Sequence, residues 1–132
     1  MASVSVFRAG LFTGKRIVVS GGGTGIGRSI ARELASLGAT VILCSRSLEH
    51  LEPTRAEIVA AGGAATALVC NIRDPESVEK FFAQVVERTG HVDGLVNNAG
   101  GQFLSPAESI SPKGWHAVVE TNLTGAFLMS KA

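Results

Sequence analysis

The 132-residue sequence has few of the residues that mark a disulfide framework or a metal site. Its two cysteines, Cys44 and Cys70, show neither Cys-x-x-Cys spacing nor a histidine at ligand spacing, so we expect no metal and read both as buried thiols. Free buried thiols are typical of a reducing compartment. No signal peptide and no apolar run long enough to cross a bilayer is visible, which favours a cytoplasmic location.

Charge of either sign is also scarce. Charged residues make up 17% of the chain, hydrophobic residues 45%, and the net charge is +1. This balance gives no reason to expect nucleic acid or a membrane surface as a partner. The length allows one domain with a real core, although it is small for an enzyme that binds a dinucleotide.

Glycine, in contrast, is abundant, and one glycine-rich turn organises the chain. The β-branched run at residues 16–20 stops there and an amphipathic pattern begins directly afterwards, which predicts a strand, a tight turn and a helix N-terminus. Such a turn binds the pyrophosphate of a dinucleotide, whereas a merely flexible loop needs neither flanking element. The predicted cofactor-binding residues of the turn are Gly21, Gly23, Thr24, Gly25, Ile26 and Gly27.

Apolar runs and helix signals then alternate along the rest of the chain. We expect strands near 16–20, 40–45, 66–71 and 92–97, with helices near 25–37, 47–61, 74–89 and from 111 onwards. The first helix should bury one face made of Ile26, Ile30, Leu34 and Leu37. This order predicts an α/β fold, the N-terminal part of a doubly wound Rossmann-type parallel sheet with strand order 3-2-1-4 and helices on both faces. Residues 1–14 form an irregular lead-in, and residues 15–132 form an NADP-binding domain that is incomplete at its C-terminus.

The end of the second predicted strand bears on the choice of cofactor. An NAD site places an acid there to accept hydrogen bonds from the ribose, but the sequence offers Ser45 and Arg46, with no acid before Glu49. Arg46 can hold a 2′-phosphate and Ser45 can add a hydroxyl, so NADP (NADPH) is favoured over NAD. A solvated arginine is the alternative. Arg28, beside the last glycine of the turn, either supplements this site or is a surface residue.

Polar residues also follow the third and fourth predicted strands. Asn71 and Ile72 end the third strand, where an asparagine can equally close a turn. Asn97, Asn98, Ala99 and Gly100 follow the fourth.

Asn122 lies on the same helical face as Trp115, Val118 and Val119, so its amide needs hydrogen-bond partners. We interpret the three histidines as surface or packing residues: His50, His91 and His116.

These motifs resemble those of the short-chain dehydrogenase/reductase family. The family turn is Thr-Gly-x-x-x-Gly-x-Gly, with Ser20 here in place of the threonine, and Asn97-Asn98-Ala99-Gly100 matches the family's Asn-Asn-Ala-Gly. Within the family, the segments at 98–108, 113–118 and 120–125 resemble peroxisomal trans-2-enoyl-CoA reductase and its bacterial relatives, and the dienoyl-CoA reductases less closely. The resemblance implies an NADPH-dependent oxidoreductase that reduces a 2-enoyl-CoA thioester, works as a homo-oligomer, and is peroxisomal if eukaryotic.

The resemblance also implies roles for individual residues. Asn71 would bond the adenine amino group, and Ala99 and Gly100 would pass close to the cofactor ribose. Asn97 and its neighbours, Asn98 among them, would pin the fourth strand to the glycine turn. Asn122 would be the catalytic residue, since in the family this asparagine distorts its helix and holds a water that relays protons to a lysine.

The sequence departs from the family in one respect. The family's proton-transfer pair is a Tyr-x-x-x-Lys motif further along the chain, and this chain has no tyrosine. We therefore expect the N-terminal part of a longer enzyme, inactive as it stands. The alternatives are a 3-oxoacyl or other carbonyl reductase of the same family and a nucleotide-binding module without catalysis.

Overall fold

The computed structural model describes residues 5–102 and 104–132. The first four residues of the predicted lead-in, and Phe103 in the segment that carries the resemblance, lie outside the described residues. Four parallel strands form one sheet in the order β3-β2-β1-β4, as predicted. The strands are β1 (Arg16–Ser20), β2 (Thr40–Ser45), β3 (Ala64–Val69) and β4 (Gly94–Val96).

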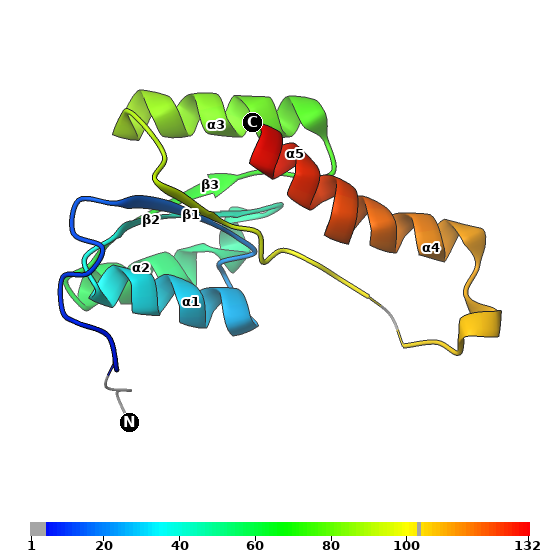
Figure 1. Cartoon of the computed structure of the whole chain (residues 1–132), viewed down its shortest axis with the longest axis horizontal. Helices are drawn as coiled ribbons and strands as arrows, with labels where there is room; N and C mark the ends of the chain where they lie inside the picture. Colours follow the sequence, from blue (N-terminus) through cyan, green and yellow to red (C-terminus); the bar gives the residue numbers. More distant parts are fainter. Residues whose placement is uncertain (1–4, 103) are drawn as a thin grey trace.

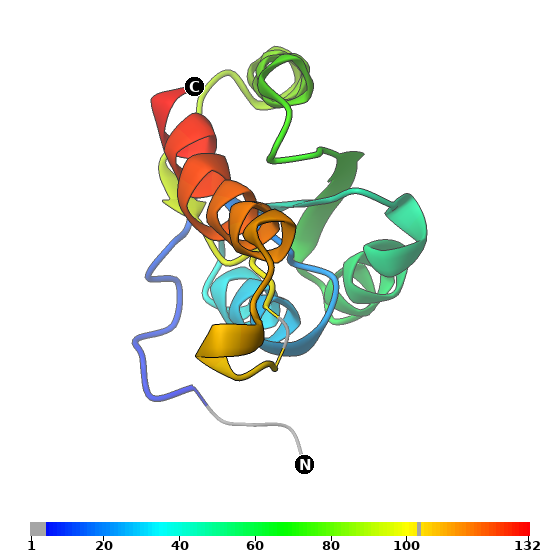
Figure 2. The same ribbon diagram turned by 90° about the vertical axis from the view of Figure 1, so that its right-hand side faces the viewer.

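Helices cover both faces of this sheet. The helical segments are α1 (Gly25–Ser36), η1 (Leu48–His50), α2 (Glu52–Ala60), α3 (Pro75–Thr89), η2 (Ala107–Ser109), α4 (Pro112–Val119), η3 (Glu120–Thr124) and α5 (Gly125–Lys131). Helices α1 and α2 pack on one face, and α3 and α5 on the other (Figures 1 and 2). Residues 5–15 form turns without a helix or strand.

The core has two halves, because successive strand residues point to opposite faces. Toward α1 and α2 lie Ile17, Val19, Val41, Leu43, Ala31, Ala35, Leu51 and Ile58. Toward α3 and α5 lie Val18, Ile42, Cys44, Leu68, Phe81, Val85 and Met129. With both faces covered, the central strands read as continuous apolar runs, as expected for a parallel sheet.

One part of the predicted core is wrong. Ile26 is 75% exposed, although its spacing suggested the buried face of the first helix. Helix α1 begins beyond the carboxyl end of β1, so its first turn has no sheet beneath it. The small residues Ala31 and Ala35 are the buried apolar residues of this helix, and Ile30 and Leu34 are only partly buried beside them.

Several element boundaries also differ from the prediction. Strand β3 begins at Ala64, two residues early, because its ladder with β2 starts directly after the Gly62-Gly63 turn, at the pair Thr40–Ala64. Strand β4 is shorter than expected, since only Gly94–Val96 pairs with β1. The predicted helix at 47–61 is divided into the short turn η1 and helix α2, whose first turn contains Pro53.

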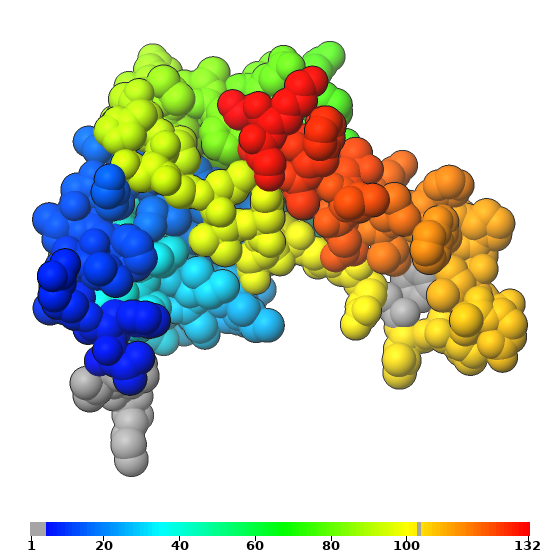
Figure 3. Space-filling view, in the orientation of Figure 1, coloured from blue at the N-terminus to red at the C-terminus, as the bar shows by residue number. Residues whose placement is uncertain are grey.

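The last helical segment is a continuous rod with a change of hydrogen-bond pattern in its middle. Helix α4 leads into the π-helical turn η3, which leads into α5. The rod packs on the body through α5, while η2 and the start of α4 project away from it (Figures 1 and 3). None of the described helices has the length and apolar character needed to span a bilayer.

Candidate functional site

The carboxyl ends of the parallel strands meet at one edge of the sheet, and a cavity of about 780 Å³ lies there. The surface is hollowed on this side, between the start of α1 and the projecting α4 (Figure 3). Every predicted cofactor-binding residue except Gly23 lines it: Gly21, Thr24, Gly25, Ile26, Gly27, Ser45, Arg46, Asn71, Ile72, Asn98, Ala99 and Gly100. Its position matches the ligand crevice of open α/β sheets.

Parts of the glycine turn are packed so closely that a side chain cannot replace the glycine hydrogen, as at Gly23 and Gly27. A Cβ on Gly27 would lie 2.2 Å from the carbonyl oxygen of Gly21, and a Cβ on Gly23 would lie 2.0 Å from that of His50. Gly21 has φ +66°, and its N–H donates to the carbonyl of Cys44 at 2.8 Å. Gly23 is therefore part of the support beneath the turn, which explains why it does not line the cavity.

The N-terminus of α1 opens into this cavity. Its N-cap residue, Thr24, has an extended backbone and makes no side-chain capping hydrogen bond, and no acidic residue occupies the first turn. The free N–H groups and the helix dipole therefore favour an anion at this point. The buried Thr54 hydroxyl holds the turn from behind by donating to the Gly23 carbonyl at 2.8 Å.

Ser20 and Asn98 join the glycine turn to the end of β4. The buried Ser20 hydroxyl oxygen accepts from the backbone N–H of Asn98 at 3.1 Å and of Ala99 at 3.0 Å. The Asn98 amide donates to the carbonyl oxygens of Ser20 and Gly21. Of the residues expected to pin this strand to the turn, Asn98 does so and Asn97 does not. The Asn97 amide points to α5, where it donates to the Ser130 hydroxyl at 2.9 Å.

Beyond β2, the cavity wall is made of exposed side chains. Ser45 uses its hydroxyl to close a local turn, donating to the carbonyl of Ser47 at 2.7 Å. Arg46 is exposed and lines the cavity, and it takes part in none of the ion pairs among the described residues. Its guanidinium is thus available to a ligand. Arg28 points elsewhere and pairs with Glu57 of α2.

At the end of β3, Asn71 closes a turn and also lines the cavity. Its amide oxygen accepts from the N–H of Arg73 at 3.2 Å, and one lone pair of that oxygen remains for another donor. The thiols of Cys44 and Cys70 lie next to each other at the cavity floor. The hydrogen bond with Cys70, together with burial, raises the pKa of the Cys44 thiol, so it stays neutral.

Asn122 lies in the π-helical turn η3, and its side chain brackets Gly101. The amide nitrogen donates to the Gly101 carbonyl at 2.7 Å and to the Val118 carbonyl at 2.9 Å, while the amide oxygen accepts from the Gly101 N–H at 3.2 Å. The amide has the partners that the sequence required. Asn122 is exposed and fixes the loop after β4, beside the cavity.

The cavity also includes residues that the sequence reasoning did not assign to it: Cys44, Ser47, His50, Cys70, Arg73, Gly101 and Thr121. Several of these directly follow or end a strand, so their position at the carboxyl edge of the sheet was a usable signal. His50 had been interpreted as a surface residue, and it is exposed, but η1 brings it to the rim of the cavity.

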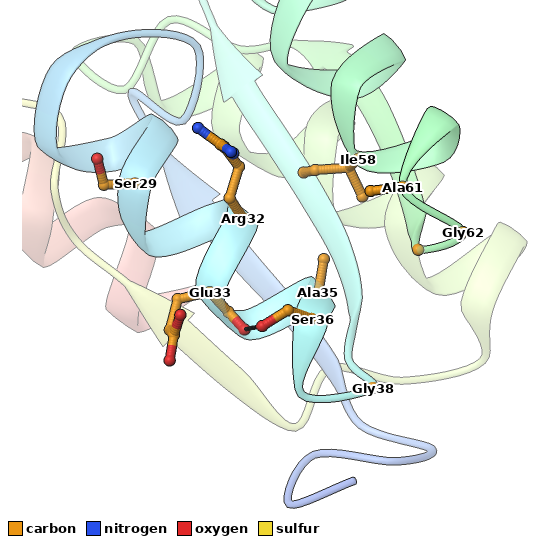
Figure 4. Close-up of a pocket in the computed structure, with 10 residues that line it drawn as sticks. Ser29, Arg32, Glu33, Ala35, Ser36, Gly38, Ile58, Ala61 and Gly62 are labelled. Carbon is orange, nitrogen blue, oxygen red and sulfur yellow. Dashed lines mark hydrogen bonds between the residues drawn. The ribbon is translucent and has the colours of Figure 1, made fainter. Parts of the chain in front are cut away.

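A second hollow, of about 450 Å³, lies between α1 and the end of α2 (Figure 4). Gly38 and Gly63, which line it, precede β2 and β3, so it is at the opposite end of the sheet from the strand carboxyl ends. Arg32 and Glu33 are its charged lining residues. Across residues 5–102 and 104–132, no group of three or more side chains could hold a metal ion.

Comparison with known proteins agrees with this geometry. A 2,4-dienoyl-CoA reductase of Bacillus subtilis (strain 168), named as probable, is 36% identical over 118 residues, which are 89% of this chain and 46% of that protein. The citronellol catabolism dehydrogenase of Pseudomonas aeruginosa PAO1 is 49% identical, with a TM-score of 0.91 over 96% of this chain and 52% of the other. An actinorhodin polyketide ketoreductase, solved with NADPH, is 41% identical, with a TM-score of 0.85 over 89% of this chain and 45% of the other.

The chain thus spans about half the length of these relatives. The family model described as short chain dehydrogenase matches residues 15–132, from the start of β1 through the glycine turn to the end of α5. The chain belongs to the short chain dehydrogenase family.

Proposed function

We propose that this chain supplies the cofactor site of an NADPH-dependent oxidoreductase that reduces a 2-enoyl-CoA thioester. The observation that carries the proposal is the joint presence, in one cavity, of an uncapped helix N-terminus and an arginine without an ion-pair partner among the described residues. The first fits a pyrophosphate, and the second fits a 2′-phosphate. The glycine turn fits the cofactor as well, because a Cβ on Gly25, which lines the cavity, would meet no protein atom within 4 Å, so this space is open to a ligand.

The residues of this chain then divide the work of binding. Gly21, Thr24 and Gly25 face the pyrophosphate, Arg46 holds the 2′-phosphate, and Asn71 accepts from the adenine amino group. Ile72 lies against the adenine, and the backbone at Asn98, Ala99 and Gly100 passes beside the ribose. When bound, NADPH would supply a hydride to the substrate.

We assign Asn122 to proton transfer because the family resemblance implies that role, and its local geometry is compatible with it. Its side chain fixes Gly101, which lines the cavity, and it lies in a π-helical turn, a distortion that is frequent at functional sites. A water held in this turn would relay protons to a lysine, as the family resemblance implies. The 132 residues contain no tyrosine to act as the acid, so we expect them to bind NADPH without catalysing turnover on their own.

The proposal includes a homo-oligomer that works in the cytoplasm. Three large apolar side chains, Trp115, Leu123 and Phe127, are exposed along α4, η3 and α5, at spacings that repeat on one helical side. A helical surface of this kind suits association with a second subunit. The free thiols Cys44 and Cys70 suit a reducing compartment.

The test is turnover by the protein isolated from its own host, with NADPH and crotonyl-CoA as substrates. We expect NADPH to be oxidised as the 2-enoyl thioester is consumed, and NADH to be a poorer donor. The relatives named for dienoyl-CoA reduction and for polyketide ketoreduction support an acyl thioester as the substrate class.

Two outcomes would contradict the proposal. Reduction of a 3-oxoacyl thioester without reduction of crotonyl-CoA would assign the protein to carbonyl reduction within the same family. NADPH binding without turnover of either substrate would leave a nucleotide-binding module.

A further inference from the structure

The turn η3 is attached to two separate loops that line the cavity. Asn122 fixes Gly101, in the loop after β4. At the start of the same turn, Glu120 accepts a hydrogen bond from the guanidinium of Arg73, in the loop after β3, with the Nη2 and Oε2 atoms 2.5 Å apart. Gly101 and Arg73 both line the cavity, so η3 connects two of its walls.

The turn η3 has a rare π-helical hydrogen-bond pattern, so its contacts with the two loops bear on how it is held. In a π-helical turn, hydrogen bonds between residues five apart replace the usual α-helical bonds between residues four apart. Two side chains compensate, since Thr121 donates to the Ala117 carbonyl at 2.9 Å and Asn122 donates to the Val118 carbonyl at 2.9 Å. Asn122 and Glu120 add contacts from the turn to neighbouring loops, at Gly101 and Arg73.

The backbone of the helical rod also packs closely against the loop after β3. Gly125, the first residue of α5, is buried, and a Cβ there would lie 2.8 Å from the Ile72 side chain. Ile72 lines the cavity next to Arg73. The rod thus reaches this wall at two points, the glycine contact and the ion pair.

We propose that the Arg73–Glu120 ion pair is a positioning device for the cofactor, and this inference rests on the proposed function. Arg73 forms part of the cavity wall that faces the adenine, and Glu120 holds it in place from η3. The same pair ties the turn that carries Asn122 to that wall. Glu120 does not line the cavity, so it acts only through Arg73.

Little folding stability depends on this pair. The side chains of Arg73 and Glu120 are 40% and 53% exposed, and such solvent-exposed pairs contribute little to folding. A role in positioning therefore predicts altered cofactor affinity with an almost unchanged unfolding midpoint. A purely structural role predicts a lowered unfolding midpoint with an almost unchanged cofactor affinity.

The decisive variant is Glu120→Arg, because two explanations predict opposite results for it. Added positive charge near an anion site should tighten NADPH binding if only the electrostatic field matters. If Glu120 positions Arg73, the variant should weaken binding, by about three- to tenfold, in the range of coupling between contacting residues. Arg73→Glu should weaken it at least as much, and the double charge swap, Arg73→Glu with Glu120→Arg, should bind NADPH more tightly than Arg73→Glu alone because it restores the ion pair.

The experiment measures the Kd of NADPH for the protein from its own host and for these variants, with the unfolding midpoint of each. Glu120→Gln, which keeps the side-chain size, provides a second test if charge reversal disturbs folding, and it should also weaken binding. The charge reversal Lys80→Glu, at the exposed Glu76–Lys80 pair of α3, is the matched control and should not change the Kd.

The inference is overturned if Glu120→Arg binds NADPH as tightly as the wild type or more tightly, or if the double swap is no better than Arg73→Glu alone. Failure of the wild-type protein to bind NADPH at all is a different result. It would remove the proposed function, and the inference with it.

Discussion

The two sides of the cavity are built in different ways. On the β1 and β4 side, the walls are mainly backbone: glycines such as Gly27 that have no room for a Cβ, a helix N-terminus, and the Ser20–Asn98 hydrogen bonds. On the β2 side, the wall is made of exposed side chains such as Arg46 and His50. A site built of backbone suits the pyrophosphate, which NAD and NADP share. A wall of side chains suits the 2′-phosphate, by which NADP differs from NAD.

Gly27→Ala should have the largest effect, because it alters the backbone side. The new Cβ would lie 2.2 Å from the Gly21 carbonyl oxygen and 2.4 Å from the Asn98 amide nitrogen, so the turn must shift. We expect NADPH and NADH to lose affinity alike, because both carry the pyrophosphate that the turn binds. Calorimetric titration of both cofactors measures this.

The matched control for this variant is Gly94→Ala in β4, where the nearest atoms to a new Cβ are Ile17 carbons at 3.6 Å. It should bind both cofactors normally. Normal cofactor binding by Gly27→Ala would show that the turn is not the pyrophosphate site.

Arg46→Ala should have the next largest effect, and only on one cofactor. Loss of hydrogen bonds to a charged group costs about 1.5–3 kcal/mol, or roughly ten- to a hundredfold in the Kd of NADPH. The Kd of NADH should not change, because NADH has no 2′-phosphate. Arg55→Ala, at an arginine that pairs with Glu52 on α2, is the control and should leave both affinities alone. An equal loss for both cofactors in Arg46→Ala would place Arg46 away from the 2′-phosphate.

The glycine turn, the strand order and the edge of the sheet could be predicted from the sequence, because they depend on local signals. Glycine spacing, β-branched runs and helix caps are read within a few residues, and the alternation of elements then gives the parallel sheet. The Ser45, Asn71 and Asn98 positions followed from strand ends alone.

What could not be predicted depends on contacts between distant residues. The exposure of Ile26 depends on how far α1 extends past β1, and the pairing of Arg28 with Glu57 depends on the packing of α1 against α2. A distortion of the helix at Asn122 was expected only through the family resemblance, and its π-helical form is seen only in the structure. Its attachment to Arg73 needs the three-dimensional structure, because the two partners are 47 positions apart.

Ser20→Ala tests the bond between the two backbone-built walls and should mainly affect stability. It removes the buried hydroxyl that accepts from the N–H groups of Asn98 and Ala99. The Asn98 N–H keeps its hydrogen bond to the Val96 carbonyl at 3.0 Å, but the Ala99 N–H loses its partner, and an unsatisfied group costs about 1–3 kcal/mol. Denaturant unfolding should show this loss. Ser36→Ala, at an exposed hydroxyl of α1, should stay within about 0.5 kcal/mol of the wild type. Similar stability for both variants would mean that the Ser20 hydroxyl does not hold the walls together.

Asp93→Asn should have the smallest effect, at the opposite end of the sheet from the cavity. The N–H of Arg16 at 2.8 Å and the Lys15 ammonium at 3.1 Å lower the pKa of Asp93 below its usual value. A carboxyl with a lowered folded-state pKa stabilises the fold above its unfolded pKa, about 3.9, and the contribution disappears as the pH falls through the folded value.

The unfolding midpoint of the wild type and Asp93→Asn, followed from pH 7 downwards, measures this contribution. The difference between them should be constant near neutral pH and vanish in the acid range. A difference that grows as the pH falls below about 4 would contradict the assignment. Neither cofactor affinity should change in this variant.

Parallel titrations of NADPH and NADH into the protein from its own host test the central claim most directly. The backbone cradle predicts that both bind, and the side-chain wall at Arg46 predicts that NADPH binds about ten- to a hundredfold more tightly. Equal affinity, or tighter binding of NADH, would contradict the assignment of the 2′-phosphate to the side-chain wall at Arg46.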